Sequence, residues 1–251
     1  MRLFSLVIML LGLISFSSLA AKISDLEFIT EQYAPFNYQD SMGKRQGFAI
    51  EILAQVWKKL GVAPQPIRML PWARGYALTL QKNNTVLFST TRIHSREKLF
   101  KWACPISYIR VSLMGRSDSK IKINSLEDAK KYKIVAIRSD VGEQLLLENN
   151  FDEDNIHLSN HLDSALRMVM RGRVDLISSA DITAYQKLIA MGEDPELFKT
   201  QWVLESNPLC FAFNRNVDDA LVEKFSRALS DIQGDHQFIY QLEKKYRMVH
   251  D

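Results

Sequence analysis

Hydroxyl and guanidinium side chains gather directly after an apolar run in the segment from Val86 to Trp102, VLFSTTRIHSREKLFKW. The apolar residues 86–88 suit a buried strand, and the polar residues after them include Arg92 and Arg96. Serine and threonine hydroxyls each donate one hydrogen bond, and a guanidinium meets a carboxylate through two parallel hydrogen bonds. The segment therefore has the chemistry of a site for a small acid, although the same residue types also suit a solvated turn.

Two other predicted strands are followed by aromatic side chains. Residues 26–30 are predicted to form a strand with Tyr33 in the loop after it, and residues 66–70 a strand that runs into Trp72 and Arg74. In open α/β sheets, ligands bind beyond the carboxyl ends of the strands. These side chains are therefore expected at the same edge of the sheet as the segment described above.

Helical periodicity separates the strands, which predicts an α/β fold with a parallel sheet flanked by helices. Apolar residues recur at helical spacing from Ile50 to Leu60, between the start and stop signals Gly47 and Gly61. Later helices are predicted around the stripes 162–170, 222–232 and 239–246, with Asp218 as an N-cap, and residues 209–213 are predicted to form a strand.

A second β-loop-α rhythm begins at residue 134. Residues 134–137 are predicted to form a strand, and the polar turn 138–142 leads into a helix for which Asp140 is the expected N-cap. Backbone N–H groups at such a helix start also suit an anion or a carbonyl oxygen. Residues 174–177 form the next predicted strand, with Ser178 to Asp181 as its polar end.

Composition excludes several classes of protein. The 251 residues are 47% hydrophobic and 24% charged, which is ordinary for a folded globular chain. The formal net charge of +3, without a run of basic residues, gives no support for nucleic-acid binding. The five histidines have no metal-ligand spacing and no glycine-rich phosphate loop is present, so neither a metal nor a cofactor is expected.

The first 21 residues have the pattern of a secretory signal peptide. Arg2 precedes an apolar run, and small residues lead up to an expected cleavage site after Ala20 or one residue later. A periplasmic, soluble mature protein is therefore predicted. Export permits a disulfide between Cys104 and Cys210, but two cysteines 106 positions apart leave that pairing open.

Four motifs occur in a recognisable order: YAPFNY, GFAIEILAQVWKKLG, STTRIHSREKLFKWACPISY and GRVDLISSAD. In this order the chain resembles the bacterial extracellular solute-binding proteins of family 3, which are periplasmic receptors of polar amino-acid transporters. The resemblance implies a periplasmic-binding-protein-like α/β fold, with two α/β lobes, a ligand cleft and two hinge crossings. Lobe 1 is expected to contain residues 22–109 and 208–251, and lobe 2 residues 110–207.

The resemblance also implies a set of ligand-binding residues. Tyr33 corresponds to the aromatic residue that stacks on the ligand, and Trp72 lies within one residue of a second one. Ser89 and Thr91 match the hydroxyl donors, and Arg96 matches the arginine that holds the ligand carboxylate. The turn of the second lobe is matched by Ser139, Asp140, Val141 and Gly142.

Two departures from the family pattern concern the acids that bind an α-amino group. Thr30 and Ala180 stand where such acids are usual, and Glu31 or Asp181, each one position further on, are the available substitutes. Asp181 is the one included among the expected ligand-binding residues. A shift of one residue along a strand sends a side chain to the opposite face, so neither substitution follows from sequence alone.

A third departure concerns positive charge. Arg74, Arg92 and Arg96 all follow predicted strand ends of lobe 1, and Arg74 is counted among the ligand-binding residues. If two of the three face the cleft, an acidic or multiply carboxylated ligand should bind better than lysine or arginine. This expectation depends mainly on Arg74.

The sequence thus predicts a binding protein, without catalysis, that captures a small carboxylate-bearing or amino-acid-like solute by hinge closure for ABC-type uptake. Its expected partner is a membrane permease, and it is expected to act as a monomer. Two alternatives stay open: a periplasmic enzyme of the same fold that resembles cyclohexadienyl dehydratase, and a sensory protein that presents ligand to a membrane receptor. The identity of the ligand does not follow from the sequence.

Overall fold

The computed structural model describes residues 22–40 and 42–248, so the predicted signal peptide at residues 1–21 lies outside the described residues. Within the described residues, no helix combines the length and apolar character that a membrane span requires. The described residues form an eight-stranded mixed sheet in the order β4-β1-β5-β10-β6-β9-β7-β8, with a small separate ribbon of β2 and β3.

One half of the sheet contains three parallel strands. They are β1 (Glu27–Thr30), β4 (Ile67–Met69) and β5 (Thr85–Thr91), with β1 in the middle. The helices of this half are α1 (Phe48–Lys59), α2 (Trp72–Gln81), α7 (Asp219–Gln233) and α8 (His236–Lys245), and its ribbon is β2 (Tyr38–Gln39) with β3 (Arg45–Gln46).

The other half repeats the parallel pattern. Its strands are β7 (Ile134–Ile137), β8 (Ile156–Ser159) and β9 (Leu176–Ala180), with β7 in the middle. Its helices are α3 (Leu126–Ala129), α4 (Val141–Glu148), α5 (Leu162–Met170) and α6 (Asp181–Ala190). The prediction of parallel strands flanked by helices is therefore confirmed within each half.

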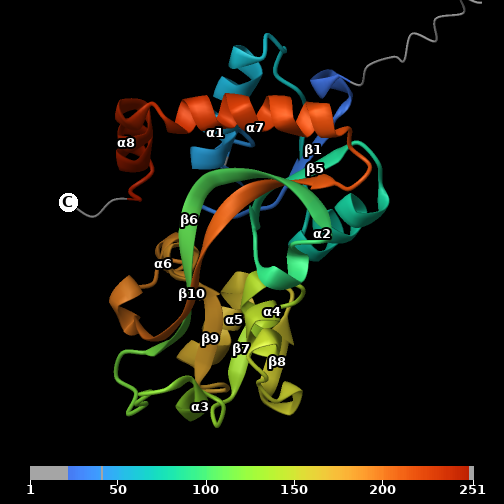
Figure 1. The fold of residues 1–251 in the computed structure, drawn as a ribbon. Helices are drawn as coiled ribbons and strands as arrows, with labels where there is room; N and C mark the ends of the chain where they lie inside the picture. The colour runs from blue at the N-terminus through green and yellow to red at the C-terminus, as the bar shows by residue number, and fades with distance from the viewer. Residues whose placement is uncertain (1–21, 41, 249–251) are drawn as a thin grey trace, which may run out of the picture.

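Two long antiparallel strands connect the halves. They are β6 (Phe100–Arg116) and β10 (Phe198–Asn214), which pair along most of their length. In the first half β10 pairs with β5, and in the second half β6 pairs with β9. Figure 1 shows both strands running from the upper half to the lower half.

Each half has an apolar core, and the core cluster of the first half extends to Val141, Leu145 and Ala180 of the second half. In the first half, Phe225 of α7 packs against Phe28, Phe211 and Phe213, with ring centroids 4.8–6.3 Å apart. In the second half, the buried side chains of α5 pack with those of β7 and β9. The predicted stripes at 162–170, 222–232 and 239–246 thus contribute buried core residues. The stripe from Ile50 to Leu60 is only partly correct, because both of these residues are half-buried and the buried face of α1 also includes Phe48, Ile52 and Val56.

Helix α2 lies against β1 and β5 at a small residue. A Cβ atom at Gly75 would lie 3.3 Å from side-chain atoms of Ile29 and Leu87, so glycine permits a close approach of the helix. This approach sets the position of the two aromatic residues, Trp72 and Tyr76, on the buried face of α2.

Several predicted boundaries differ from the observed ones. Strand β5 continues to Thr91, although a solvated turn was the alternative interpretation of Ser89 to Thr91, and β9 continues through Ser178 to Ala180. In both places a neighbouring long strand supplies hydrogen-bond partners, which allows a polar strand end to be buried. The residues after Pro71, which follow the predicted strand 66–70, begin α2, because proline is tolerated at a helix start.

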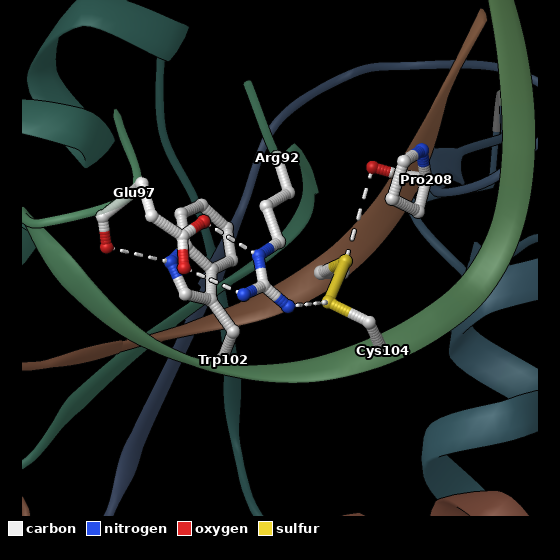
Figure 2. A network of polar contacts seen from close by, with 6 residues as sticks. Arg92, Glu97, Trp102, Cys104 and Pro208 are labelled. Carbon is white, nitrogen blue, oxygen red and sulfur yellow. Dashed lines mark hydrogen bonds and ion pairs between the residues drawn. A yellow bond between two sulfur atoms is a disulfide. The ribbon is translucent and has the colours of Figure 1, made fainter. Parts of the chain in front are cut away.

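A disulfide joins the two connecting strands where they leave the first half. Cys104 on β6 is bonded to Cys210 on β10, which resolves the pairing that the sequence left open. Figure 2 shows Arg92 beside this disulfide: its guanidinium pairs with the Glu97 carboxylate at 2.6 Å and lies over the Trp102 ring at 5.8 Å. These contacts tie the segment after β5 to the start of β6.

Candidate functional site

A fully buried arginine lies where the two halves of the molecule meet. Arg96 belongs to a single 3-10 turn, His94–Arg96, that follows β5, and its exposed fraction is 0%. Its Nε donates to Oε1 of Gln144 at 2.7 Å, and its two terminal nitrogens donate to the carbonyls of Thr91 and Ser139, each at 3.2 Å. The first-half guanidinium is thus bound by α4 and the turn before it.

Two aromatic rings hold this guanidinium. The Arg96 guanidinium lies 5.0 Å from the ring centroid of Trp72 and 5.3 Å from that of Tyr76. Rings four residues apart on α2 share one face of the helix, which explains why both reach the same cation. The indole nitrogen of Trp72 also donates to the Ser139 carbonyl at 2.7 Å, a second contact between the halves.

Two carboxyl groups from opposite halves lie near Arg96. Glu31 follows β1 directly, and Asp140 is the N-cap of α4, where its Oδ1 accepts from the Val141 N–H at 2.6 Å. Burial raises the pKa of Glu31 well above its usual range, and the Asp140 charge raises it further, against a lowering by Arg96. Burial also raises the pKa of Asp140, which Arg96 again opposes.

Arg96 has no carboxylate partner within ion-pair distance among the described residues, although both acids are close enough to interact with it electrostatically. Burial lowers the pKa of Arg96, and Asp140 acts in the opposite direction. Its direct acceptors are neutral oxygen atoms, and three of its five N–H donors are engaged by them.

Tyr33 and Ser89 complete the first-half side of the site. Tyr33 is buried and its ring lies 5.7 Å from that of Phe36, and burial followed by the Asp140 charge raises its pKa. Ser89 is 5% exposed, has a φ of +57°, and its Oγ has no hydrogen-bond partner among the described residues. A buried hydroxyl of this kind requires an explanation, and a bound ligand provides one.

Gly142 and Val141 have no polar side chain to offer a ligand, and they instead fix the turn of the second half by packing. A Cβ atom at Gly142 would lie 2.3 Å from the Ser178 carbonyl oxygen, so α4 can begin this close to β9 because the residue is glycine. The Ser178 hydroxyl donates to the Gly142 carbonyl at 2.9 Å, and Val141 is buried. These contacts fix the position of Ser139 and Asp140.

The structure does not bring Arg74 or Asp181 to Arg96. Arg74 is exposed on α2. Asp181 begins α6, where its Oδ2 pairs with Arg110 at 2.6 Å and accepts from Thr200 at 3.3 Å. Figure 1 places α6 on the other side of the connecting strands from α2 and α4.

Asp181 and Arg110 instead line a separate cavity of about 1010 Å³ between the halves. The other walls of this cavity include residues 105–109 of β6 and residues of α6, α7 and α8, and none of its lining residues is a hydrogen-bond or ring partner of Arg96. The excess of positive charge expected from Arg74, Arg92 and Arg96 is not found around Arg96, because Arg92 pairs with Glu97 and Arg74 is exposed on α2.

Sequence reasoning missed two residues of this site. Tyr76 lies four positions after Trp72, and Gln144 lies four positions after Asp140, so helical spacing from a predicted site residue was the available signal. Within the described residues, no group of three or more histidine, cysteine or acidic residues is arranged to hold a metal ion.

The family model for "Bacterial extracellular solute-binding proteins, family 3" matches residues 27–248. A Haemophilus influenzae protein described as a "Probable amino-acid ABC transporter-binding protein" is 26% identical over 216 residues, which cover 81% of this chain and 77% of that protein.

Solved structures of several kinds share the fold. A histidine kinase sensor domain with similarity to periplasmic binding proteins matches with a TM-score of 0.77 at 17% identity, covering 88% of this chain and 95% of the other. An ancestral arginine-binding protein bound to arginine matches with a TM-score of 0.72 at 19% identity, covering 90% of this chain and 99% of the other. An ancestral amino acid-binding protein, a precursor of cyclohexadienyl dehydratase, matches with a TM-score of 0.72 at 22% identity, covering 88% of this chain and 94% of the other. These likenesses confirm the fold that the sequence motifs implied.

Proposed function

The chain belongs to the bacterial extracellular solute-binding proteins of family 3, and from that premise we propose that it captures a small amino-acid-like solute between two lobes for ABC-type uptake. Lobe 1 comprises residues 22–109 and 208–251, and lobe 2 residues 110–207. In this proposal the protein acts as a periplasmic monomer, after removal of the signal peptide at residues 1–21, and delivers the solute to a membrane permease. The amino-acid description of the Haemophilus influenzae relative supports this class of ligand.

The single observation that carries the proposal is the environment of Arg96. A guanidinium with an exposed fraction of 0% carries a large desolvation cost unless a partner compensates it. Its present acceptors are neutral, and two of its N–H groups have no acceptor among the described residues. A ligand carboxylate is the partner that a guanidinium binds most strongly, through two parallel hydrogen bonds.

Hinge closure follows from the same contacts. Arg96 and Trp72 of lobe 1 meet the Ser139 carbonyl of lobe 2, and the Ser95 N–H meets the Glu148 carboxylate at 3.0 Å. The chain crosses between the lobes in β6 and β10, and two paired crossing strands of this kind suit a rigid-body rotation of one lobe against the other. Ligand bound to Arg96 would stabilise the closed arrangement, because contacts from both lobes then converge on one molecule.

The test begins with identification of small molecules that the purified protein retains, by mass spectrometry. Calorimetry and thermal shift then compare wild type with Arg96→Ala. Loss of one partner of a buried charged pair costs several kcal/mol, so affinity should fall by at least about a hundredfold. Arg96→Lys should also bind weakly, since an ammonium cannot form the bidentate contact.

Arg92→Ala is the matched control, because it removes a nearby arginine that pairs with Glu97. It should bind the retained ligand as wild type does. Circular dichroism and chemical denaturation establish that each variant is folded. Full binding by a folded Arg96→Ala protein would remove Arg96 from the site and with it the basis of the proposal.

The enzyme alternative predicts a different result. Turnover of prephenate or arogenate at a rate proportional to protein concentration, retained through further purification, would replace the binding function by catalysis. In the transport proposal neither compound is converted. A sensory role uses the same ligand site, so the membrane partner captured by cross-linking in the native host distinguishes a permease from a receptor.

A further inference from the structure

One face of α4 is turned toward lobe 1. Val141 and Leu145 are buried in an apolar cluster whose other members come mostly from lobe 1. Gln144 and Glu148 lie three and seven positions after Val141, so they belong to the same side of the helix. This face of α4 therefore combines an apolar centre with two polar side chains that reach across the lobe interface.

Both polar side chains bind the turn that contains Arg96. Oε1 of Gln144 accepts from Nε of Arg96 at 2.7 Å, and the Glu148 carboxylate accepts from the Ser95 N–H at 3.0 Å. Arg96 is also held from its own lobe, because its Nη1 donates to the Thr91 carbonyl at 3.2 Å. The guanidinium is thus fixed between the two lobes by atoms of the chain itself.

A backbone carbonyl of lobe 2 adds two more contacts. The Ser139 carbonyl accepts from Nε1 of Trp72 at 2.7 Å and from Arg96 at 3.2 Å. Together with the bonds of Gln144 and Glu148, four hydrogen bonds cross between the lobes at this edge. Three of them involve an ionised group, which makes them stronger than bonds between neutral groups. Their donors and acceptors all belong to the chain, so their contribution to closure does not depend on a solute.

We propose that Gln144 and Glu148 form a latch that draws lobe 2 onto lobe 1 before a solute binds. Gln144 is the positioning residue of this latch, because it orients the Arg96 guanidinium from the opposite lobe. Two N–H groups of Arg96 stay available for a carboxylate, so the latch and a bound solute are compatible. One consequence rests on the proposed function: solute affinity should rise with the fraction of protein that is already closed.

Substitutions at Gln144 should move the lobes in opposite directions. Gln144→Leu removes the acceptor of a charged donor, which should lower the ratio of closed to open protein at least about tenfold. Gln144→Glu places a carboxylate against Arg96 and should raise the same ratio, because this ion pair forms only in the closed arrangement. Glu148→Ala removes the second contact and should change the ratio in the direction of Gln144→Leu.

The measurement uses solute-free protein, prepared by unfolding in guanidinium chloride, dialysis and refolding with the disulfide intact. Small-angle X-ray scattering gives the radius of gyration, and hydrogen exchange followed by NMR gives the protection of the Ser95 N–H, the donor to Glu148. Compared with wild type, Gln144→Leu should have a larger radius and Ser95 protection at least about tenfold lower. Gln144→Glu should have a smaller radius and higher protection.

Gln186→Leu is the matched control. It replaces a half-buried glutamine of lobe 2 that lines the cavity on the other side of the connecting strands, and it should match wild type in both measurements. Circular dichroism establishes that each variant is folded. General destabilisation cannot imitate the expected result, because the two substitutions at Gln144 should shift both measurements in opposite directions.

The outcomes separate the latch from the proposed function. Equal radii and equal Ser95 protection in folded wild type, Gln144→Leu and Gln144→Glu would overturn the latch, whether or not the protein binds a solute. If Arg96→Ala retains full solute binding while the Gln144 variants still change the lobe separation, the proposed role of Arg96 fails and the latch is supported.

Discussion

Replacement of Cys104 and Cys210 together by alanine is expected to lower the free energy of unfolding by about 2–5 kcal/mol. The disulfide joins residues 106 positions apart, and closure of a loop near 100 residues removes about 4.7 kcal/mol of entropy from the unfolded chain at 25 °C. In the folded protein β6 and β10 are already paired around the bond, so its loss leaves their ladder in place. The effect should therefore arise mainly in the unfolded state.

The magnitude translates into a large thermal effect. For a chain of this size each kcal/mol shifts Tm by about 2–4 °C, so the full entropic term corresponds to roughly 10–20 °C. Guanidinium denaturation of wild type and the double variant, each with and without a phosphine reductant, measures the change directly. Reductant should lower the stability of wild type to that of the variant and leave the variant unchanged.

Arg92→Ala serves as a control, because it removes the neighbouring ion pair with Glu97 and retains the disulfide. A half-exposed pair of this kind should cost less than about 1 kcal/mol. A loss below about 1 kcal/mol in the double cysteine variant would refute the loop-closure reasoning. Such a result would mean that the unfolded chain already holds these segments together.

Two further predictions concern the first lobe. Gly47→Ala should lower the free energy of unfolding by more than about 2 kcal/mol, because Gly47 has a φ of +134° and a Cβ atom would lie 2.3 Å from the Phe36 carbonyl oxygen. Gly61→Ala is its control in the same denaturation assay, with a positive φ but open space around the Cβ, and should cost about 1 kcal/mol. Tyr246→Phe should cost about 1–2 kcal/mol, because it removes the hydroxyl that donates to the Glu51 carboxylate at 2.9 Å and accepts from the Gly47 N–H at 3.2 Å. Hydrogen exchange should then show weaker protection of α8, and unchanged protection would contradict the role of this hydroxyl in docking the helix.

Local sequence patterns determined most of the secondary structure. The helical stripe that ends at Leu60 and the predicted cap at Asp218 are observed, as is the capping box of Ser125 and Asp128. These features depend on residues three or four positions apart, so the sequence contains the information needed to predict them. The order of four motifs likewise identified the family.

Long-range pairing decided the strand boundaries. Strands β6 and β10 extend well beyond their apolar centres, because each provides hydrogen-bond partners for the polar stretches of the other. The disulfide depends on the same pairing, which brings residues 104 and 210 to a Cα separation of 4.6 Å. No local pattern records which distant segment lies opposite.

Tertiary structure also decided which charged groups share the site. In the sequence, Arg96 and Arg74 both follow predicted strands, so both were expected in the ligand site. In the structure, Arg96 is buried against two aromatic rings, whereas Arg74 is exposed on α2. Asp140 was predicted as a helix cap, which it is, and its place next to the Ser139 carbonyl that accepts from Arg96 arises because the two lobes meet. The sequence by itself determined which residue types follow each strand. The electrostatic interactions between charged residues of the two lobes depend on how deeply each group is buried and how far apart the groups lie. Both quantities are set by the tertiary structure.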